Sequence, residues 1–173
     1  MRNNLKIMLK RVFGPLMFLS LTLGIIAGCS TSECYDNKNS LPLAGFYSSE
    51  ETPSSITLDS ISIYGLGAPG DSILQDSVKG LKESYLPFRI DQESTTYVIQ
   101  YLSGLLGIYH IADTITFNYK IIPMFVSAAC GTVYYYKMDT IVTTHYVIDS
   151  VTCPLGEITN ANIENLKIYF RVG

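Results

Sequence analysis

Two histidines, a glycine-rich loop and scattered carboxylates are the side chains of this sequence that could serve catalysis or metal binding. His110 lies near a glycine in a predicted turn and His145 lies in a predicted strand. Neither has a second metal-type ligand at a recognisable spacing, whereas a zinc site needs three or four ligands. The sequence also contains no Gly-x-Ser-x-Gly nucleophile motif and no Asp-rich calcium loop. We therefore expect no metal, no other cofactor and no catalytic residues.

Residues 65–70, Gly-Leu-Gly-Ala-Pro-Gly, match the Gly-x-Gly-x-x-Gly pattern of dinucleotide-binding loops. That loop binds a pyrophosphate only where a strand leads directly into a helix within a βαβ unit. Here Pro69 interrupts the loop, and further antiparallel strands are predicted after it. We therefore interpret the motif as a turn.

The N-terminal segment contains a cysteine in a context typical of acylation. Residues 2–11 carry four basic side chains and no acid, and residues 12–27 are apolar. This apolar run is shorter than the ~20 residues of a membrane-spanning helix. It ends in Ile26-Ala27-Gly28-Cys29, which resembles the lipobox of bacterial lipoproteins. We expect residues 1–28 to be a cleaved signal peptide and Cys29 to receive the lipid.

A lipid on Cys29 predicts attachment to a membrane. A single acyl chain binds only marginally, but lipobox proteins carry two or three chains. Ser30, rather than an aspartate, follows the cysteine, which favours the outer membrane. Only Glu33 and Asp36 are acidic in the next residues, so we expect the periplasmic side rather than the cell surface. Residues 29–42 are polar and are predicted to be a lipidated tether.

The composition predicts one folded domain after the tether, at residues 43–173. The chain has 173 residues, of which 47% are hydrophobic and 16% are charged, and this balance is typical of a globular protein. After the basic leader, 8 basic and 15 acidic residues give a charge of −7. A body of this charge argues against nucleic acid and against anionic lipid as partners, because binding to either needs a basic face.

Alternating apolar and polar residues predict strands almost throughout this domain. Residues 95–102 are apolar on both faces and are predicted to form a central strand, whereas Pro87 predicts an edge strand at 84–90. Short links between 131–138 and 141–151 predict a hairpin that turns at Asp139-Thr140. Further strands are predicted at 44–48, at 56–64 with a bulge near Asp59-Ser60, at 113–121 and at 166–172.

The helical periodicity of residues 71–84 makes this segment the one candidate helix, although Gly80 interrupts it and a loop is the alternative. We predict an all-β fold, an antiparallel β-sandwich that is immunoglobulin-like in architecture, with at most one short helix.

Thirteen tyrosines and no tryptophan suggest an aromatic surface. Tyr134, Tyr135 and Tyr136 are consecutive in a predicted strand, so at least one of them faces outward. Exposed tyrosines stack on sugars or line protein interfaces, but tyrosine is also simply a good strand residue. We favour the second interpretation and keep the three tyrosines as a candidate binding face.

Three thiols remain once Cys29 is lipidated: Cys34, Cys130 and Cys153. An exported protein folds in an oxidising compartment, so one disulfide and one remaining thiol are expected. The residues alone leave the pairing open.

Several motifs together resemble a family of uncharacterised lipoproteins from Bacteroidales. They are Glu33-Cys34, Asp113-Thr-Ile-Thr-Phe, Pro123-Met-Phe-Val-Ser-Ala-Ala-Cys130-Gly, Ile148-Asp-Ser-Val and Asn165-Leu-Lys-Ile-Tyr-Phe170. The resemblance covers most of residues 33–172. It implies a Gram-negative envelope, a β-rich fold and a Cys34–Cys130 pair, and it implies no activity. Cys153 departs from the pattern, and we expect it to be a reduced, partly buried thiol.

Two functions fit this sequence. The first is a lipid-anchored envelope protein that acts as a non-catalytic binding or structural module at the outer membrane, with an envelope protein or a glycan as its partner. The alternative is an envelope hydrolase that acts on glycan or peptide. A hydrolase needs a convergent set of catalytic groups, and the spacing of residues indicates none, so we expect the first.

Overall fold

Two β-sheets make up nearly all of the regular structure in the computed structural model, which describes residues 40–67, 73–128 and 130–172. Strands hold 58% of these residues and helix holds 4%. The all-β prediction is therefore confirmed. The predicted signal peptide and most of the predicted tether, including Cys29 and Cys34, lie outside the described residues. All described residues belong to one compact unit, residues 35–173.

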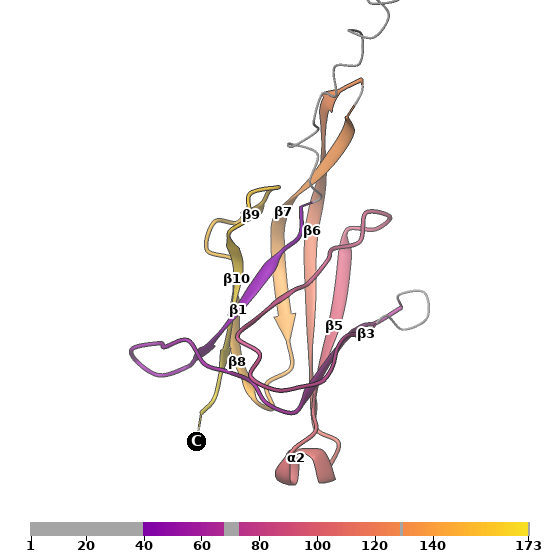
Figure 1. The fold of residues 1–173 in the computed structure, drawn as a ribbon. Helices are drawn as coiled ribbons and strands as arrows, with labels where there is room; N and C mark the ends of the chain where they lie inside the picture. Colours follow the sequence, from indigo (N-terminus) through magenta and orange to yellow (C-terminus); the bar gives the residue numbers. More distant parts are fainter. Residues whose placement is uncertain (1–39, 68–72, 129, 173) are drawn as a thin grey trace, which may run out of the picture. The chain divides into compact units, whose positions relative to one another are not determined.

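The larger sheet has six strands, all antiparallel to their neighbours, in the order β3-β2-β5-β6-β7-β9. In that order they are Ile73–Val78, Ile61–Gly65, Ser94–Tyr101, Ala112–Ser127, Gly131–Thr143 and Glu157–Ile158. β5 lies in the interior of this sheet, as predicted from its apolar residues on both faces. The hairpin of β6 and β7 is the longest pairing, and it reaches well beyond its neighbours (Figure 1).

The smaller sheet has four strands in the order β4-β1-β10-β8, and the chain passes between the two sheets several times. Its strands are Glu83–Tyr85, Leu43–Ser48, Glu164–Phe170 and Ile148–Thr152. β1 and β10 pair in parallel, and the other pairs are antiparallel. The sandwich-like arrangement confirms the predicted architecture, with this one parallel pair as an addition. β4 lies at an edge, as Pro87 indicated.

The core lies between the sheets because each sheet turns its alternating apolar side chains inward. Ile115, Phe117 and Tyr119 of β6 are at most 1% exposed. From the smaller sheet, Phe170 packs edge-on against Phe46 with ring centroids 5.8 Å apart. The alternation of apolar and polar residues along the strands therefore gives each sheet one buried face, as expected for a sandwich.

The predicted helix over residues 71–84 is wrong, because the described part of this segment forms β3, a turn and β4. β3 pairs with the free edge of β2. For this segment the pairing outweighs the helical periodicity, because Gly80 would weaken a helix. The positive φ values of Ser77 (49°) and Gly80 (68°) mark the end of the strand and the turn. The helix within residues 40–67, 73–128 and 130–172 is α2, Gly104–Ile108, a single turn between β5 and β6.

The predicted hairpin around Asp139-Thr140 is also wrong. β7 runs straight through these two residues, and its partner is β6. Both residues are exposed, so a polar pair is tolerated in the strand without a turn. After Thr143 the chain crosses to the smaller sheet, and His145 therefore lies in a loop rather than in the predicted strand.

The remaining predicted strands are mostly confirmed, with shifted ends. The strand predicted over 56–64 with a bulge near Asp59-Ser60 is shorter in the structure: β2 begins at Ile61, and Ser60 just before it has a φ of 55°. The predicted edge strand ends at Tyr85 rather than at Ile90, although Leu86 and Phe88 are buried.

A buried carboxylate fixes the crossing from β7 to β8. Asp113 of β6 is fully buried, and its two oxygens accept hydrogen bonds from five donors. The Thr144 hydroxyl (2.7 Å) and the Tyr146 N–H (2.8 Å) donate to Oδ1. The N–H groups of Val147 (2.8 Å) and Ile148 (3.0 Å) and the hydroxyl of Tyr101 (2.9 Å) donate to Oδ2.

These donors decide the charge of Asp113. Burial by itself raises the pKa of a carboxyl group. The N–H of Ile148, the Thr144 hydroxyl and the N–H groups of Val147 and Tyr146 outweigh burial and hold the pKa of Asp113 below its ordinary value. The side chain is therefore an ionised structural group, which joins the loop before β8 to the larger sheet.

We expect Asp113→Asn to lower the free energy of unfolding by about 1–3 kcal/mol at neutral pH, because the amide leaves at least one buried N–H without an acceptor. Because folding lowers the pKa of Asp113, its contribution is full above the unfolded pKa of about 4 and is lost as the pH falls through the folded value. Urea unfolding of both proteins between neutral and acidic pH measures this difference.

The matched control is Asp91→Asn, because Asp91 is an exposed aspartate that pairs with Arg89 at 2.6 Å. Exposed pairs contribute at most about 1 kcal/mol. Equal stability of Asp113→Asn and the parent protein at neutral pH would show that this carboxylate does not hold the crossing.

Candidate binding cleft

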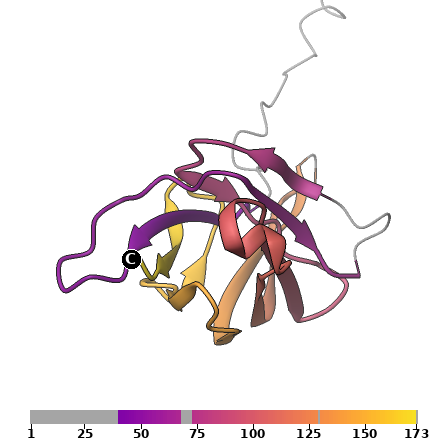
Figure 2. The ribbon, with the colours of Figure 1, turned by 90° about the horizontal axis from the view of Figure 1, so that it is seen from below.

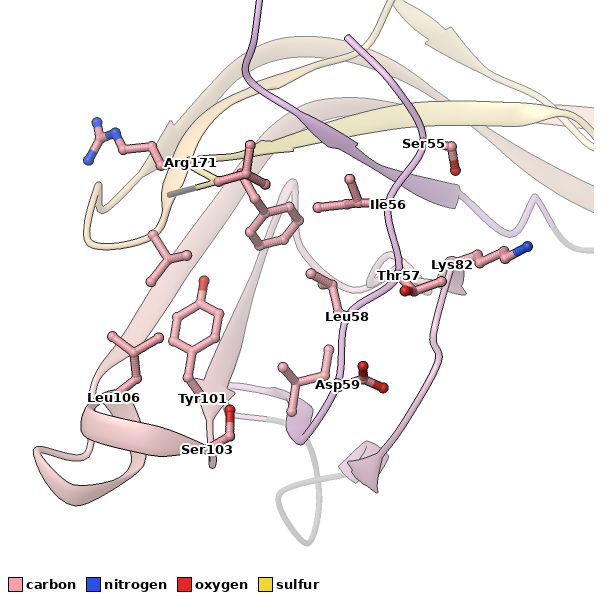
Figure 3. Close-up of a pocket in the computed structure, with 14 residues that line it drawn as sticks. Ser55, Ile56, Thr57, Leu58, Asp59, Lys82, Tyr101, Ser103, Leu106 and Arg171 are labelled. Atoms are coloured by element: carbon pink, nitrogen blue, oxygen red, sulfur yellow. The ribbon is translucent and has the colours of Figure 1, made fainter.

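A cavity of about 680 Å³ opens at the α2 end of the sandwich. Figure 2 views the molecule from this end, and Figure 3 shows the lining side chains. The lining comes from the segment before β2, the ends of β5 and β10, α2 and the loop before β8. We call this cavity the cleft. It lies where the core of the sandwich reaches the surface.

The floor of the cleft is apolar and rigid. Ile61, Tyr101 and Phe170 line it and are at most 5% exposed, so they belong to the core as well. One wall is the segment with Ile56 and Leu58, which is held by backbone bonds from Ile56 N–H to Phe46 O (3.0 Å) and from Leu58 N–H to Leu81 O (2.8 Å). A ligand would therefore meet a preformed apolar surface.

The helix α2 extends this apolar surface beyond the cleft. Leu106 lines the cleft, and Leu105, Ile108 and Tyr109 are each 71% exposed. Gly107 lets the helical turn lie close to the end of β5, because a Cβ at this position would lie 2.5 Å from the carbonyl oxygen of Leu102. A cluster of exposed apolar side chains is typical of interaction surfaces.

Three charged residues line the rim, and two of them are bound within the fold. Asp59 accepts a hydrogen bond from the Gly80 N–H at 2.5 Å. Arg171 donates to the carbonyl oxygen of His145 at 2.6 Å and lies 3.5 Å from Asp149. Lys82 is exposed at the opposite side of the opening (Figure 3). Because Asp149 pairs with Arg171, Lys82 is the cation at the rim with which an anionic group of a ligand could pair.

Tyr101 is the ionisable group on the floor. Burial, followed by the charge of Asp113 and the hydrogen bond to it, raises the pKa of the Tyr101 phenol. The phenol therefore keeps its proton and donates a hydrogen bond to Asp113. Tyr101 and Asp113 thus support the cleft from below.

The three consecutive tyrosines do not share one exposed face. Tyr136 is 4% exposed and packs edge-on against Phe88, with ring centroids 5.3 Å apart. Tyr134 is half-buried against the core. Tyr135 is half-buried too, and its hydroxyl donates to Asn160 Oδ1 at 3.0 Å. A binding role for the run stays a prediction.

Neither histidine and neither of the two described cysteines lines the cleft. His110 lies in the predicted turn with a φ of 51°, and His145 is exposed in the loop before β8. Cys153 is a half-buried free thiol whose pKa is raised by burial, although the Gly156 N–H opposes the shift. Cys130 follows β6, and its N–H donates to Ser127 Oγ at 3.0 Å. Its predicted partner Cys34 lies outside the described residues.

The described residues contain neither a cluster of metal ligands nor a membrane-spanning helix. No group of three or more His, Cys, Asp or Glu side chains there is placed to hold a metal ion. Within the same part of the chain, no helix has the length and apolar character needed to cross a membrane. Of the Gly65–Gly70 motif, Gly65 ends β2 and the next two residues form a turn, while residues 68–70 lie outside the described ranges.

The sequence analysis missed the cleft. Its lining residues come from five separate segments, and each is unremarkable in its own segment. One local feature of the sequence pointed to the cleft wall. The apolar alternation of Ile56 and Leu58 is out of phase with that of Ile61 and Ile63, and this shift marks where the wall segment ends and the sheet begins.

Comparison with known proteins gives a family and no activity. The model of a protein family, described as a family of unknown function (DUF6452), matches residues 60–170. The matched residues include nine of the ten described strands. No curated protein and no solved structure matches the chain.

Proposed function

We propose that this chain, which belongs to the DUF6452 family of unknown function, is a lipid-anchored, non-catalytic binding module of a Gram-negative envelope. In this proposal Cys29 carries the lipid and holds the protein at the outer membrane on the periplasmic side. The motifs that resemble Bacteroidales lipoproteins support this location. The cleft is the single observation on which the binding role depends.

The chemistry of the cleft favours a protein segment as ligand over a glycan. Ile56, Leu58 and Ile61 offer aliphatic contacts, which suit an apolar side chain and leave sugar hydroxyls without partners. Lys82 at the rim favours an acidic neighbour of that side chain. We therefore propose a partner segment with an apolar residue beside an acidic one.

A binding role is also supported by the way in which the nearest ionisable groups are used. The carboxylate of Asp113 accepts five hydrogen bonds from the fold, and the phenol of Tyr101 is one of the donors. Groups bound in this way serve to hold the floor in place, which is what a preformed binding surface needs.

The lipid anchor is tested by Cys29→Ala in cells fed radioactive palmitate. We expect the variant to lose the label and to keep its leader, because the thiol that receives the lipid is gone. The matched control is Cys153→Ala, which should be labelled and processed like the parent. Label retained in Cys29→Ala would overturn the lipoprotein assignment.

The cleft is tested by photo-crosslinking in cells. We expect a benzoyl-phenylalanine at Leu106, which lines the cleft, to capture one predominant envelope protein. A second change, Lys82→Glu, should weaken this adduct by a factor of about 5, because a surface ion pair contributes up to ~1 kcal/mol. Mass spectrometry identifies and quantifies the adduct.

Two controls accompany that experiment. Lys79→Glu makes the same charge change at an exposed lysine outside the cleft lining, and it should leave the adduct intact. The photoreactive residue at Val142, which is 60% exposed on β7, should not capture the same protein. Equal capture from Val142, or equal loss with both glutamates, would show that the cleft is not the binding site.

The cysteine pairing is a further prediction of the proposed function. We expect non-reducing peptide mapping of the exported protein to give a Cys34–Cys130 disulfide and a reduced Cys153. The bond closes a loop of nearly a hundred residues, which the chain-entropy model equates with roughly 4–5 kcal/mol as an upper value. A Cys130–Cys153 bond, or three thiols open to alkylation, would contradict the pairing.

A further inference from the structure

The end of the β6–β7 hairpin opposite α2 is apolar on both faces. Up to Tyr119 the side chains of β6 alternate between the core and the surface. From residue 122 to residue 125 all four are exposed: Ile122 by 37%, Met124 by 44% and Phe125 by 72%, with Pro123 between them. We call residues 122–125 the apolar arm. Figure 1 shows this end of the hairpin rising past the other strands.

The apolar arm has no third strand beside it among the described residues. β5 pairs with β6 only between Ala112 and Asn118, and β9 reaches β7 only at Tyr136 and Lys137. Residues 122–125 therefore pair only with β7. Part of this ribbon is covered, because Val133, the register partner of Met124, is only 1% exposed. A two-stranded ribbon is marginal in water by itself, and the exposed apolar side chains of residues 122–125 still need a covering surface.

The distribution of charge indicates what that surface is. Residues 121–136 contain no charged side chain. The first charges on each strand are Lys120 and Lys137, which face each other in the register of the hairpin. Tyr134 and Tyr135 lie opposite Pro123 and Ile122, at the end of the arm that is nearer the lysines. Lys120 is also paired with Glu93 at 2.6 Å. From the tip inward the order is therefore apolar side chains, then tyrosines, then lysines, as from the acyl region of a membrane to its polar surface.

The chain toward Cys29 leaves the domain beside the arm. Ser40, the first described residue, lines a cavity of about 180 Å³ together with Tyr134 and Tyr136. Tyr134 is the register partner of Pro123 in the arm. Eleven residues lead from Cys29 to Ser40, which limits their separation to about 40 Å. A lipid on Cys29 would thus bring the arm end of the domain to the membrane.

We propose that the apolar arm inserts into the lipid surface that holds the acyl chains of Cys29. The arm is then a second, non-covalent membrane contact. β6 spans roughly 50 Å from the arm to the α2 end, so the cleft faces away from the membrane. This inference rests on the proposed lipid anchor, and its test separates the two.

The absence of tryptophan from the chain provides a clean reporter. Phe125→Trp places a single indole on the arm, and Tyr109→Trp places one directly after α2 at the other end. The two native side chains are exposed to nearly the same extent, 72% and 71%. Each lipidated full-length protein is reconstituted into vesicles of phosphatidylethanolamine and phosphatidylglycerol that contain lipids brominated on their acyl chains. Flotation reports the anchor, and quenching of the indole reports the arm.

We expect both proteins to float. The indole at 125 should emit at shorter wavelength and lose more than half of its intensity to the brominated lipid, whereas the indole at 109 should be unchanged. Met124→Trp repeats the measurement on the arm in case Phe125→Trp does not fold, as circular dichroism would show.

The other outcomes contradict the proposal in distinguishable ways. Proteins that float while the arm indole stays unquenched would refute the arm contact and leave the anchor intact. A blue shift that depends on protein concentration without quenching would show that a second copy covers the arm. Equal quenching at 125 and 109 would refute the orientation. Failure of both proteins to float would refute the anchor and the arm contact together.

Discussion

The carboxylate of Asp113 is the constraint on which the rest of this structure depends. It lies on β6 in the larger sheet, and four of its five donors come from the segment that carries the chain into the smaller sheet. The fifth donor, Tyr101, is at the end of β5. One ionised side chain therefore sets where β8 starts, how Val147 meets the cleft and how the floor is held. The fold stabilises the charge by surrounding it with hydrogen-bond donors.

The two ends of the long β6 strand differ in chemistry. At one end the sandwich opens into a cleft with an apolar floor and two cations on its rim. At the other end the strand continues past the core as an uncharged, apolar ribbon. A domain that was only a structural spacer would need neither feature. The separation of the two surfaces along a stiff hairpin is consistent with a protein that is held at one end and binds at the other.

The fold could be predicted from the sequence to the extent that side-chain period determines it. The alternation at Ile115, Phe117 and Tyr119 identified the buried face of β6, and the apolar faces of residues 95–102 identified a central strand. Periodicity could not decide between two local structures when the choice depends on which strand the segment pairs with. The free edge of β2 made residues 73–78 a strand. Asp139 and Thr140 are residue types common in turns, but here they are exposed positions within the paired strand β7, and the strand continues through them.

The functional surfaces were harder to predict, because they depend on contacts between distant segments. The cleft combines Ile56, Leu106 and Phe170, which no local spacing relates. The five-donor site of Asp113 uses backbone N–H groups, which every residue other than proline has, so its sequence signature is only a single aspartate in an alternating strand. The uncharged stretch from 121 to 136 was visible, but its meaning required knowing that the hairpin leaves the sheet.

The parallel pairing of β1 with β10 has a consequence for how the chain acquires its structure. Leu43 meets Glu164, and Ser48 meets Phe170, so the first strand of the domain finds its central neighbour only among the last residues. Contacts between such distant residues are slow to form, because a long loop must close before they contribute. Until β10 has been added, the smaller sheet lacks the strand that joins β1 to β8. A chain built in this way cannot complete its smaller sheet until nearly all of it is available, a property that would suit the export proposed above.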